Sequence, residues 1–182
     1  TQCVDYVVRD YIAPVIDLRT LDVVEHDANS PYSPVAATAS DNLYNSTQIS
    51  LTFTSNVDPY TLGTYQDTYT ATDAAGNVST KVRTVNVVDR VAPVISGKNG
   101  GVLKIGVGSS YNVVEALNFS DNYDAPADLV ANLKTLYNDV NLQEAGLYSF
   151  VVETSDNSGN ASDAYTLYVD VQHKYEQRTG NV

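Results

Sequence analysis

The stretch GTYQDTYTATDAAGNVSTKVRTVNVVD, residues 63–89, decides the fold. Aromatic side chains alternate from Tyr65 to Tyr69 before a turn, and valines alternate after it. Alternation with a period of two is typical of a strand that buries one face. The two runs are joined by Asp73-Ala-Ala-Gly76-Asn77, whose residue types favour a tight turn. The stretch therefore predicts a β-hairpin.

Working outward from this hairpin, we find that its landmarks occur twice in the chain. Ala13-Pro14-Val15-Ile16 recurs as Ala92-Pro93-Val94-Ile95, Asp41-Asn42 recurs as Asp121-Asn122, and Asp73, Gly76 and Asn77 recur as Asp156, Gly159 and Asn160. The landmarks keep their order, while the offset between the copies grows slightly from the first landmark to the last. Such drift is tolerated in loops, and the pattern indicates two copies of one module.

Short strands with frequent turns predict an all-β fold in which each copy is an antiparallel two-sheet sandwich. We expect a terminal strand of a preceding module or an N-terminal arm at 1–11, domains at 12–89 and 90–172, and a polar tail at 173–182. Residues 1–10 resemble the end of the first copy, so this strand either pairs with that copy's edge or complements a neighbouring molecule. Because the junction between copies is short, we expect the domains to lie end to end.

The charge composition of the chain limits the classes of partner that we expect. The 182 residues carry 10 Lys plus Arg against 22 Asp plus Glu, a net charge of -12. Such a chain repels phosphate backbones and anionic lipid surfaces, so we expect neither nucleic acid as a partner nor membrane insertion. The single cysteine, Cys3, cannot close an intrachain disulfide, and no apolar run approaches the length of a membrane span.

The residues described above resemble a known family. Ala-Pro-Val-Ile at each module start, Ser-Asp-Asn in the middle and the closing stretch 63–89 are similar to the tandem bacterial Ig-like repeats of surface and secreted proteins. That family includes the module of certain pesticidal crystal proteins and the related hyalin-type repeats. The resemblance covers about residues 12–172 and implies two tandem Ig-like β-sandwiches with a spacer, adhesive or accessory role. It implies no catalytic residue and no particular ligand.

Two local features depart from a plain sandwich. Residues Ala125 to Leu136 are a helical candidate with Asp124 as its N-cap, although Leu133 to Tyr137 reads equally well as a strand. Asp67 occupies the inward place that Phe150 holds in the second copy. A buried carboxylate must be compensated, so Asp67 is expected to be paired, near a strand end or displaced outward by a bulge. A binding contact is the alternative.

Acidic clusters are the candidate metal sites. Carboxylate and amide oxygens are ligands for calcium, and the calcium candidates are Asp41, Asn42, Asp121, Asn122 and Asp124. Solvated loops are the simpler interpretation of the same residues. Asp73, Gly76, Asn77, Asp156, Gly159 and Asn160 are interpreted as structural turns, with calcium binding as the alternative. No other cofactor is expected.

The chemistry of an enzyme is not recognisable in the sequence. The only histidines are His26 and His173, and no nucleophile elbow or phosphate loop occurs. We therefore expect a non-catalytic structural or adhesive module outside a bacterial cell, which contacts neighbouring modules or copies of itself. One alternative is a carbohydrate-binding module that uses some of the 14 tyrosines to bind cell-surface glycans. Decoration of a virion surface is another.

Overall fold

The computed structural model describes residues 9–173, and it divides the chain into two compact units, residues 1–89 and 90–182. Cys3, Tyr6 and most of the predicted terminal strand and polar tail lie outside the described residues. Within the described residues, no helix has the length and apolar character that crossing a membrane requires.

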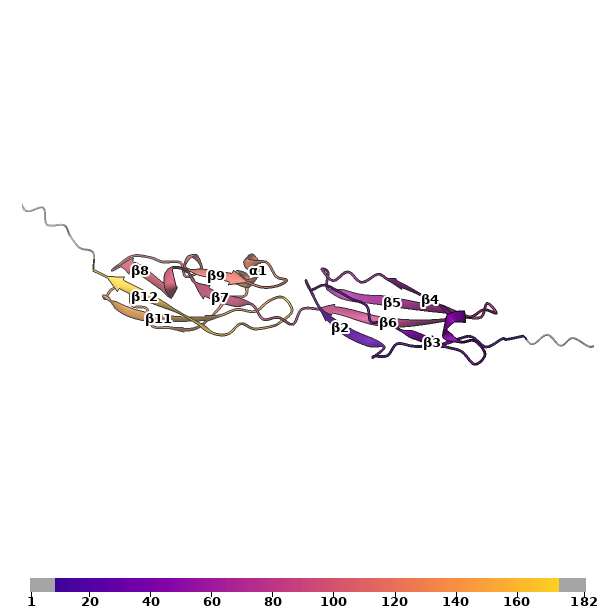
Figure 1. The fold of residues 1–182 in the computed structure, drawn as a ribbon. Coiled ribbons are helices and arrows are strands. Elements are labelled where there is room, and N and C mark those ends of the chain that lie inside the picture. The colour runs from indigo at the N-terminus through magenta and orange to yellow at the C-terminus, as the bar shows by residue number, and fades with distance from the viewer. Residues whose placement is uncertain (1–8, 174–182) are drawn as a thin grey trace, which may run out of the picture. The chain divides into compact units, whose positions relative to one another are not determined.

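Unit 1 is built from two β-sheets (Figure 1). The small sheet pairs β1 (Val15–Asp17) with β3 (Thr38–Ser40). The large sheet has the order β2-β6-β5-β4. Its strands are β2 (Val23–Asp27), β4 (Ser50–Ser55), β5 (Gly63–Thr72) and β6 (Val78–Val88). Strands β5 and β6 pair antiparallel along their length, so the hairpin predicted from residues 63–89 is confirmed.

Unit 2 repeats this topology strand for strand. The small sheet pairs β7 (Val94–Gly97) with β9 (Leu117–Ser120), and the large sheet has the order β10-β11-β12-β8. Its strands are β8 (Val102–Gly106), β10 (Lys134–Asn138), β11 (Gly146–Glu153) and β12 (Tyr165–Gln172). The predicted all-β fold of two Ig-like sandwiches is therefore confirmed.

Each sandwich contains one parallel pair, which corrects the expectation of wholly antiparallel sheets. Strand β2 runs parallel to β6, and β8 runs parallel to β12. Antiparallel neighbours such as β5 and β6 are joined by a tight turn that sets their direction. No such turn joins β2 to β6, and the alternation of inward residues is the same in either direction. The sequence pattern therefore carried no signal for this pairing.

The two units fill the space between their sheets differently. In unit 2, helix α1 (Pro126–Ala131) follows β9 and places Leu129 at 0% exposure in the core. Full burial of a leucine contributes about 1.5–3 kcal/mol. The N-cap of α1 is Ala125, so the prediction of Asp124 is wrong, and the chain turns to strand at Lys134. The corresponding segment of unit 1 is a 3-10 turn, Ser46–Gln48, which buries no residue.

Asp67 points into unit 1 from the middle of β5. It is fully buried, and its Cα partner on β6 is Arg83, which is also fully buried. The corresponding pair in unit 2 is Phe150 with Leu167. Asp67 accepts a 2.5 Å hydrogen bond from the Tyr32 hydroxyl. Burial first, and then this hydrogen bond, raise the pKa of Tyr32, which therefore remains a neutral donor. Asp67 Oδ2 thus has a donor, whereas its buried Oδ1 has no hydrogen-bond partner, and the side chain is neither displaced outward nor exposed for binding.

Candidate metal centres

The turn after each long strand aims a carboxylate inward. Asp73 accepts hydrogen bonds from the backbone N and side-chain Nδ2 of Asn77 at 2.9 and 2.8 Å. Asp156 accepts the same pair from Asn160, both at 2.7 Å. The turns close through Gly76 and Gly159, whose φ angles are 89° and 94°. Asp73 and Asp156 are only 5% and 3% exposed, so these turns hold buried carboxylates in place.

A second carboxylate comes from the turn that follows the small sheet. In unit 1, Asp41 Oδ1 accepts the backbone amides of Leu43 and Tyr44 at 2.9 and 3.1 Å. In unit 2, Asp121 Oδ2 accepts the amides of Tyr123 and Asp124 at 2.8 and 2.9 Å. Aspartate bonds of this kind to amides shortly ahead in the chain define a local turn. The same turn therefore presents Asp41 and Asp121.

The third carboxylate precedes the first strand of each module. Asp10 accepts the amide of Ile12 at 3.0 Å through Oδ1. Asp89 is the residue at the equivalent place before the second Ala-Pro-Val-Ile. It is 6% exposed. The two modules thus begin with an aspartate at the same distance from their first strand.

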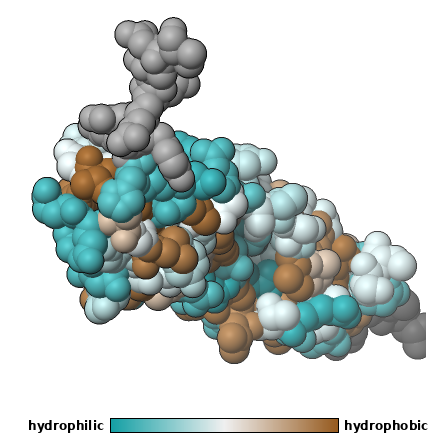
Figure 2. All heavy atoms as spheres, turned by 90° about the vertical axis from the view of Figure 1, so that its left-hand side faces the viewer, coloured by the Kyte–Doolittle hydropathy of each residue, from teal (hydrophilic) through white to brown (hydrophobic). Residues whose placement is uncertain are grey.

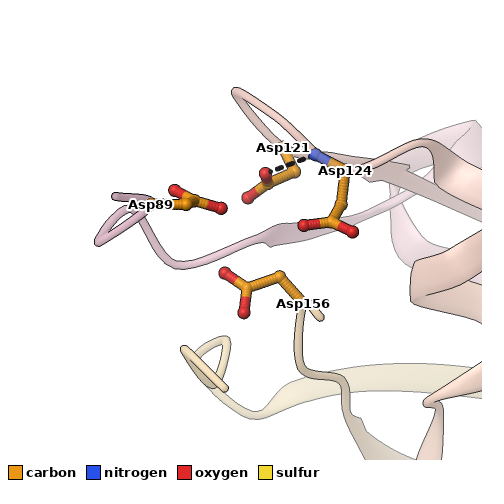
Figure 3. Close-up of side chains that lie close together, drawn as sticks. All are labelled: Asp89, Asp121, Asp124 and Asp156. Carbon is orange, nitrogen blue, oxygen red and sulfur yellow. Dashed lines mark hydrogen bonds between the residues drawn. The ribbon is translucent and has the colours of Figure 1, made fainter. Parts of the chain in front are cut away.

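These segments converge on two carboxylate clusters. Oxygens of Asp10, Asp41 and Asp73 lie within 4.8 Å of one another. Oxygens of Asp89, Asp121, Asp124 and Asp156 form the equivalent cluster, and Figure 3 shows their side chains directed toward a common centre. At such separations the repulsion between two charges is of order 3–4 kcal/mol at an effective dielectric constant near 20. A fully ionised cluster is therefore unfavourable unless a cation or a bound proton reduces its negative charge.

Local hydrogen bonds keep at least one member of the unit 1 cluster ionised. Burial alone would raise the pKa of Asp73, but hydrogen bonds from Asn77 and from the amides of Ala75 and Gly76 outweigh it. The net effect lowers the pKa of Asp73 below its ordinary value. All these side chains offer only oxygen, the donor that hard cations such as calcium prefer.

The structure changes the predicted set of residues. Asp41, Asp121 and Asp124, which were predicted as calcium candidates, lie in the clusters, while Asn42 and Asn122 occupy the same turns. Asp73 and Asp156, which were interpreted as turn residues, join them. Asp10 and Asp89 were missed. Each precedes its copy of Ala-Pro-Val-Ile by the same interval, and this repetition was the signal that could have found them.

The tyrosines among residues 9–173 differ widely in exposure. The most exposed are Tyr11, Tyr60, Tyr137 and Tyr168, which lie on separate segments, whereas Tyr69 is 2% exposed. On the face shown in Figure 2, hydrophobic residues are interspersed with hydrophilic ones. The alternative of a glycan-binding module that uses some of these rings stays a prediction.

A sequence comparison finds a relative encoded by a phage. The chain is 34% identical over 118 residues to an uncharacterized 81.3 kDa protein of Acholeplasma phage L2, covering 63% of this chain and 16% of that protein. The chain therefore spans about a sixth of the length of this relative.

Two solved structures match most of this chain at low sequence identity. One contains the M60 catalytic domain with the CBM51-1 and CBM51-2 domains of Clostridium perfringens ZmpB, with a TM-score of 0.45 and 10% identity over 92% of this chain and 32% of that one. Another holds extracellular cadherin domains 3–6 of protocadherin gamma B2, with a TM-score of 0.43 and 16% identity over 90% of this chain and 52% of that one.

A protein-family model matches part of unit 1. Residues 22–87, which span strands β2 to β6, match the model described as bacterial surface protein, Ig-like domain. Unit 2 has the same strand order as unit 1. Residues 22–87 are thus an Ig-like module similar to those of bacterial surface proteins.

Proposed function

We propose that this chain is a non-catalytic spacer or adhesive module of a longer protein exposed outside a bacterial cell. The observation that carries the proposal is the match of residues 22–87 to the bacterial surface Ig-like family, together with a second unit of the same topology. A spacer can be lengthened by one folded module at a time when the same sandwich is repeated. Neighbouring modules and further copies of the protein are the proposed partners.

The environment of His26 supports a non-catalytic role. His26 Nε2 lies 3.1 Å from the Ser30 hydroxyl, a spacing that a nucleophile and its base could share. However, Ser30 Oγ donates a 2.6 Å hydrogen bond to the Asp27 carbonyl. The His26 ring packs edge-on against Tyr32. The Ser30 hydroxyl proton is therefore directed to the Asp27 carbonyl and not to His26, which would have to accept it in a nucleophile–base pair.

Surface labelling tests the proposal directly. An antibody raised against the chain is applied to intact and to permeabilised cells of the organism that encodes it, with a cytosolic protein as the control for leakage. We expect the antibody to label intact cells, and brief external protease treatment to remove the signal. Labelling that requires permeabilisation would refute an exposed location.

The phage relative favours a second candidate, a module on the surface of a virus particle. The same antibody separates the two locations when it is applied to purified particles by immunogold microscopy. Gold on the particles, with none on uninfected cells, would support the virion role over the cellular one.

A further inference from the structure

We propose that each module binds one calcium ion, at Asp10, Asp41 and Asp73 in the first module and at Asp89, Asp121, Asp124 and Asp156 in the second, and that the second site binds more tightly. This inference does not depend on where the protein is displayed. Both the sites and the difference between them follow from the carboxylates and the turns that hold them.

Buried oxygens within the clusters support the proposal of a bound cation. The Oδ2 atoms of Asp10, Asp41 and Asp124 are shielded from solvent, and no described residue donates a hydrogen bond to them. A carboxylate oxygen that has lost water without gaining a donor is strongly unfavourable. In each of these residues the other oxygen has a donor: Ile12 for Asp10, Leu43 and Tyr44 for Asp41, and Asn157 for Asp124. The free oxygens belong to residues that contribute to the clusters, where a bound cation would satisfy them.

A carboxylate cluster forms in both modules, although the lengths of chain between its aspartates differ. The offset between the modules is larger for Asp41 and Asp121 than for Asp10 and Asp89, and it is larger again for the last pair, yet the carboxylates converge in both modules. A chance gathering of acidic residues would not persist through such insertions. The loops absorb the insertions, and the position of each carboxylate relative to the sheets is kept.

The donor set points to calcium rather than to a softer or smaller ion. Neither cluster contains cysteine or histidine, the usual ligands of zinc. Calcium takes about 6–8 oxygen ligands in flexible geometry, so three or four carboxylates leave places for backbone carbonyls or water. Magnesium requires a nearly ideal octahedron and retains much of its water, which fits an inward-facing carboxylate cluster less well.

The second site has one more charged ligand than the first. Asp124 corresponds to Tyr44, because their amides make the same hydrogen bond to the aspartate that opens the turn, so the first module has a phenol where the second has a carboxylate. The number of charged ligands and the rigidity of the site tune calcium affinity. The turn that carries Asp124 is also anchored, because α1 follows directly and its Leu129 is fully buried. We therefore expect the second site to fill at a concentration at least tenfold lower.

Calorimetric titration of the full chain with calcium chloride, after removal of metal with a chelator, tests the inference. We expect two binding events at about 0.15 M salt, with dissociation constants no weaker than the range of about 10⁻⁴ to 10⁻³ M for extracellular modules. Asp10→Asn is expected to abolish the weaker event and Asp124→Asn to weaken the tighter one at least tenfold. Asp58→Asn is the matched control, because Asp58 forms a similar turn with Tyr60 outside both clusters.

Tyr44 and Asp124 occupy the same position in the two sites, and exchanging them tests which site binds calcium more tightly. Tyr44→Asp is expected to tighten the weaker event, and Asp124→Tyr to weaken the tighter one. Terbium luminescence excited through tyrosine, and its displacement by calcium, provides a second readout, while far-ultraviolet circular dichroism verifies that each variant is folded. Binding heats absent up to about 10 mM calcium, beyond the weak end of that range, would overturn the sites. Two events that Tyr44→Asp and Asp124→Tyr leave unchanged would overturn the assignment of their order.

Discussion

Replacement of Arg83 by leucine is expected to unfold much of unit 1 while unit 2 stays intact. Arg83 is fully buried, and each of its five N–H groups has an acceptor. The acceptors are the carbonyl oxygens of Leu18, Leu21 and Val35, Thr20 Oγ1 and Tyr69 Oη. The guanidinium thereby ties β6 to the segment between β1 and β2, and it supplies a positive charge opposite Asp67.

The magnitude follows from what the substitution leaves behind. Leucine fits the position sterically, because Leu167 occupies it in unit 2, but Asp67 would remain buried without the cation opposite it. Breaking a buried charged arrangement by removing one partner costs about 3–5 kcal/mol. For a unit of this size each kcal/mol lowers the melting temperature by about 4–8 °C. The expected decrease for unit 1 is therefore at least about 12 °C.

Hydrogen exchange followed by mass spectrometry separates the two units in the intact chain. Peptides from β5 and β6 are expected to lose protection in Arg83→Leu, while peptides from β11 and β12 are unchanged. Arg83→Lys is expected to lose protection as well, because an ammonium group cannot reproduce the five-donor fork.

The double variant Asp67→Phe, Arg83→Leu copies the apolar pair of unit 2 and is expected to recover protection relative to Arg83→Leu. Wild-type exchange in β5 and β6 of Arg83→Leu would refute the reasoning. So would a double variant less protected than the single one.

Three further predictions concern the turns and clusters. Calcium at 100 times its dissociation constant is expected to stabilise a binding unit by about 2.7 kcal/mol, measured as a higher melting temperature that a chelator reverses; an unchanged melting curve contradicts it. Because the pKa of Asp73 is lowered on folding, its stabilising contribution is complete above the unfolded value near 3.8 and is lost as the pH falls through the folded pKa. Urea unfolding between pH 2 and pH 7 in chelator should therefore show a smaller acid loss for Asp73→Asn than for the wild type, and equal losses would argue against it. Gly76→Ala is expected to lower the free energy of unfolding by about 1–2 kcal/mol in the same assay, because φ at this position is 89°. No atom within 4 Å would contact the new methyl group, so only backbone strain acts. An unchanged free energy of unfolding would contradict that strain.

Much of the fold was predictable because its signals are local. The alternation in residues 63–89, the turn glycines and the repeated Ala-Pro-Val-Ile are each read within a short window of sequence, and the period of two determines which side chains face inward. The same alternation placed Asp67 at an inward position. It did not predict the hydrogen bond to Asp67 from Tyr32, a residue 35 positions away.

The sequence by itself therefore determined the two modules, their hairpins and the turns that hold Asp73 and Asp156. Only the tertiary structure decided the parallel pairing of β2 with β6, the five-bond environment of Arg83 and the carboxylate clusters. The physical reason is chain separation. Asp10, Asp41 and Asp73 are separated by long stretches of chain, so neither propensity nor periodicity relates them. They meet because two sheets pack face to face and bring the ends of three segments to one place.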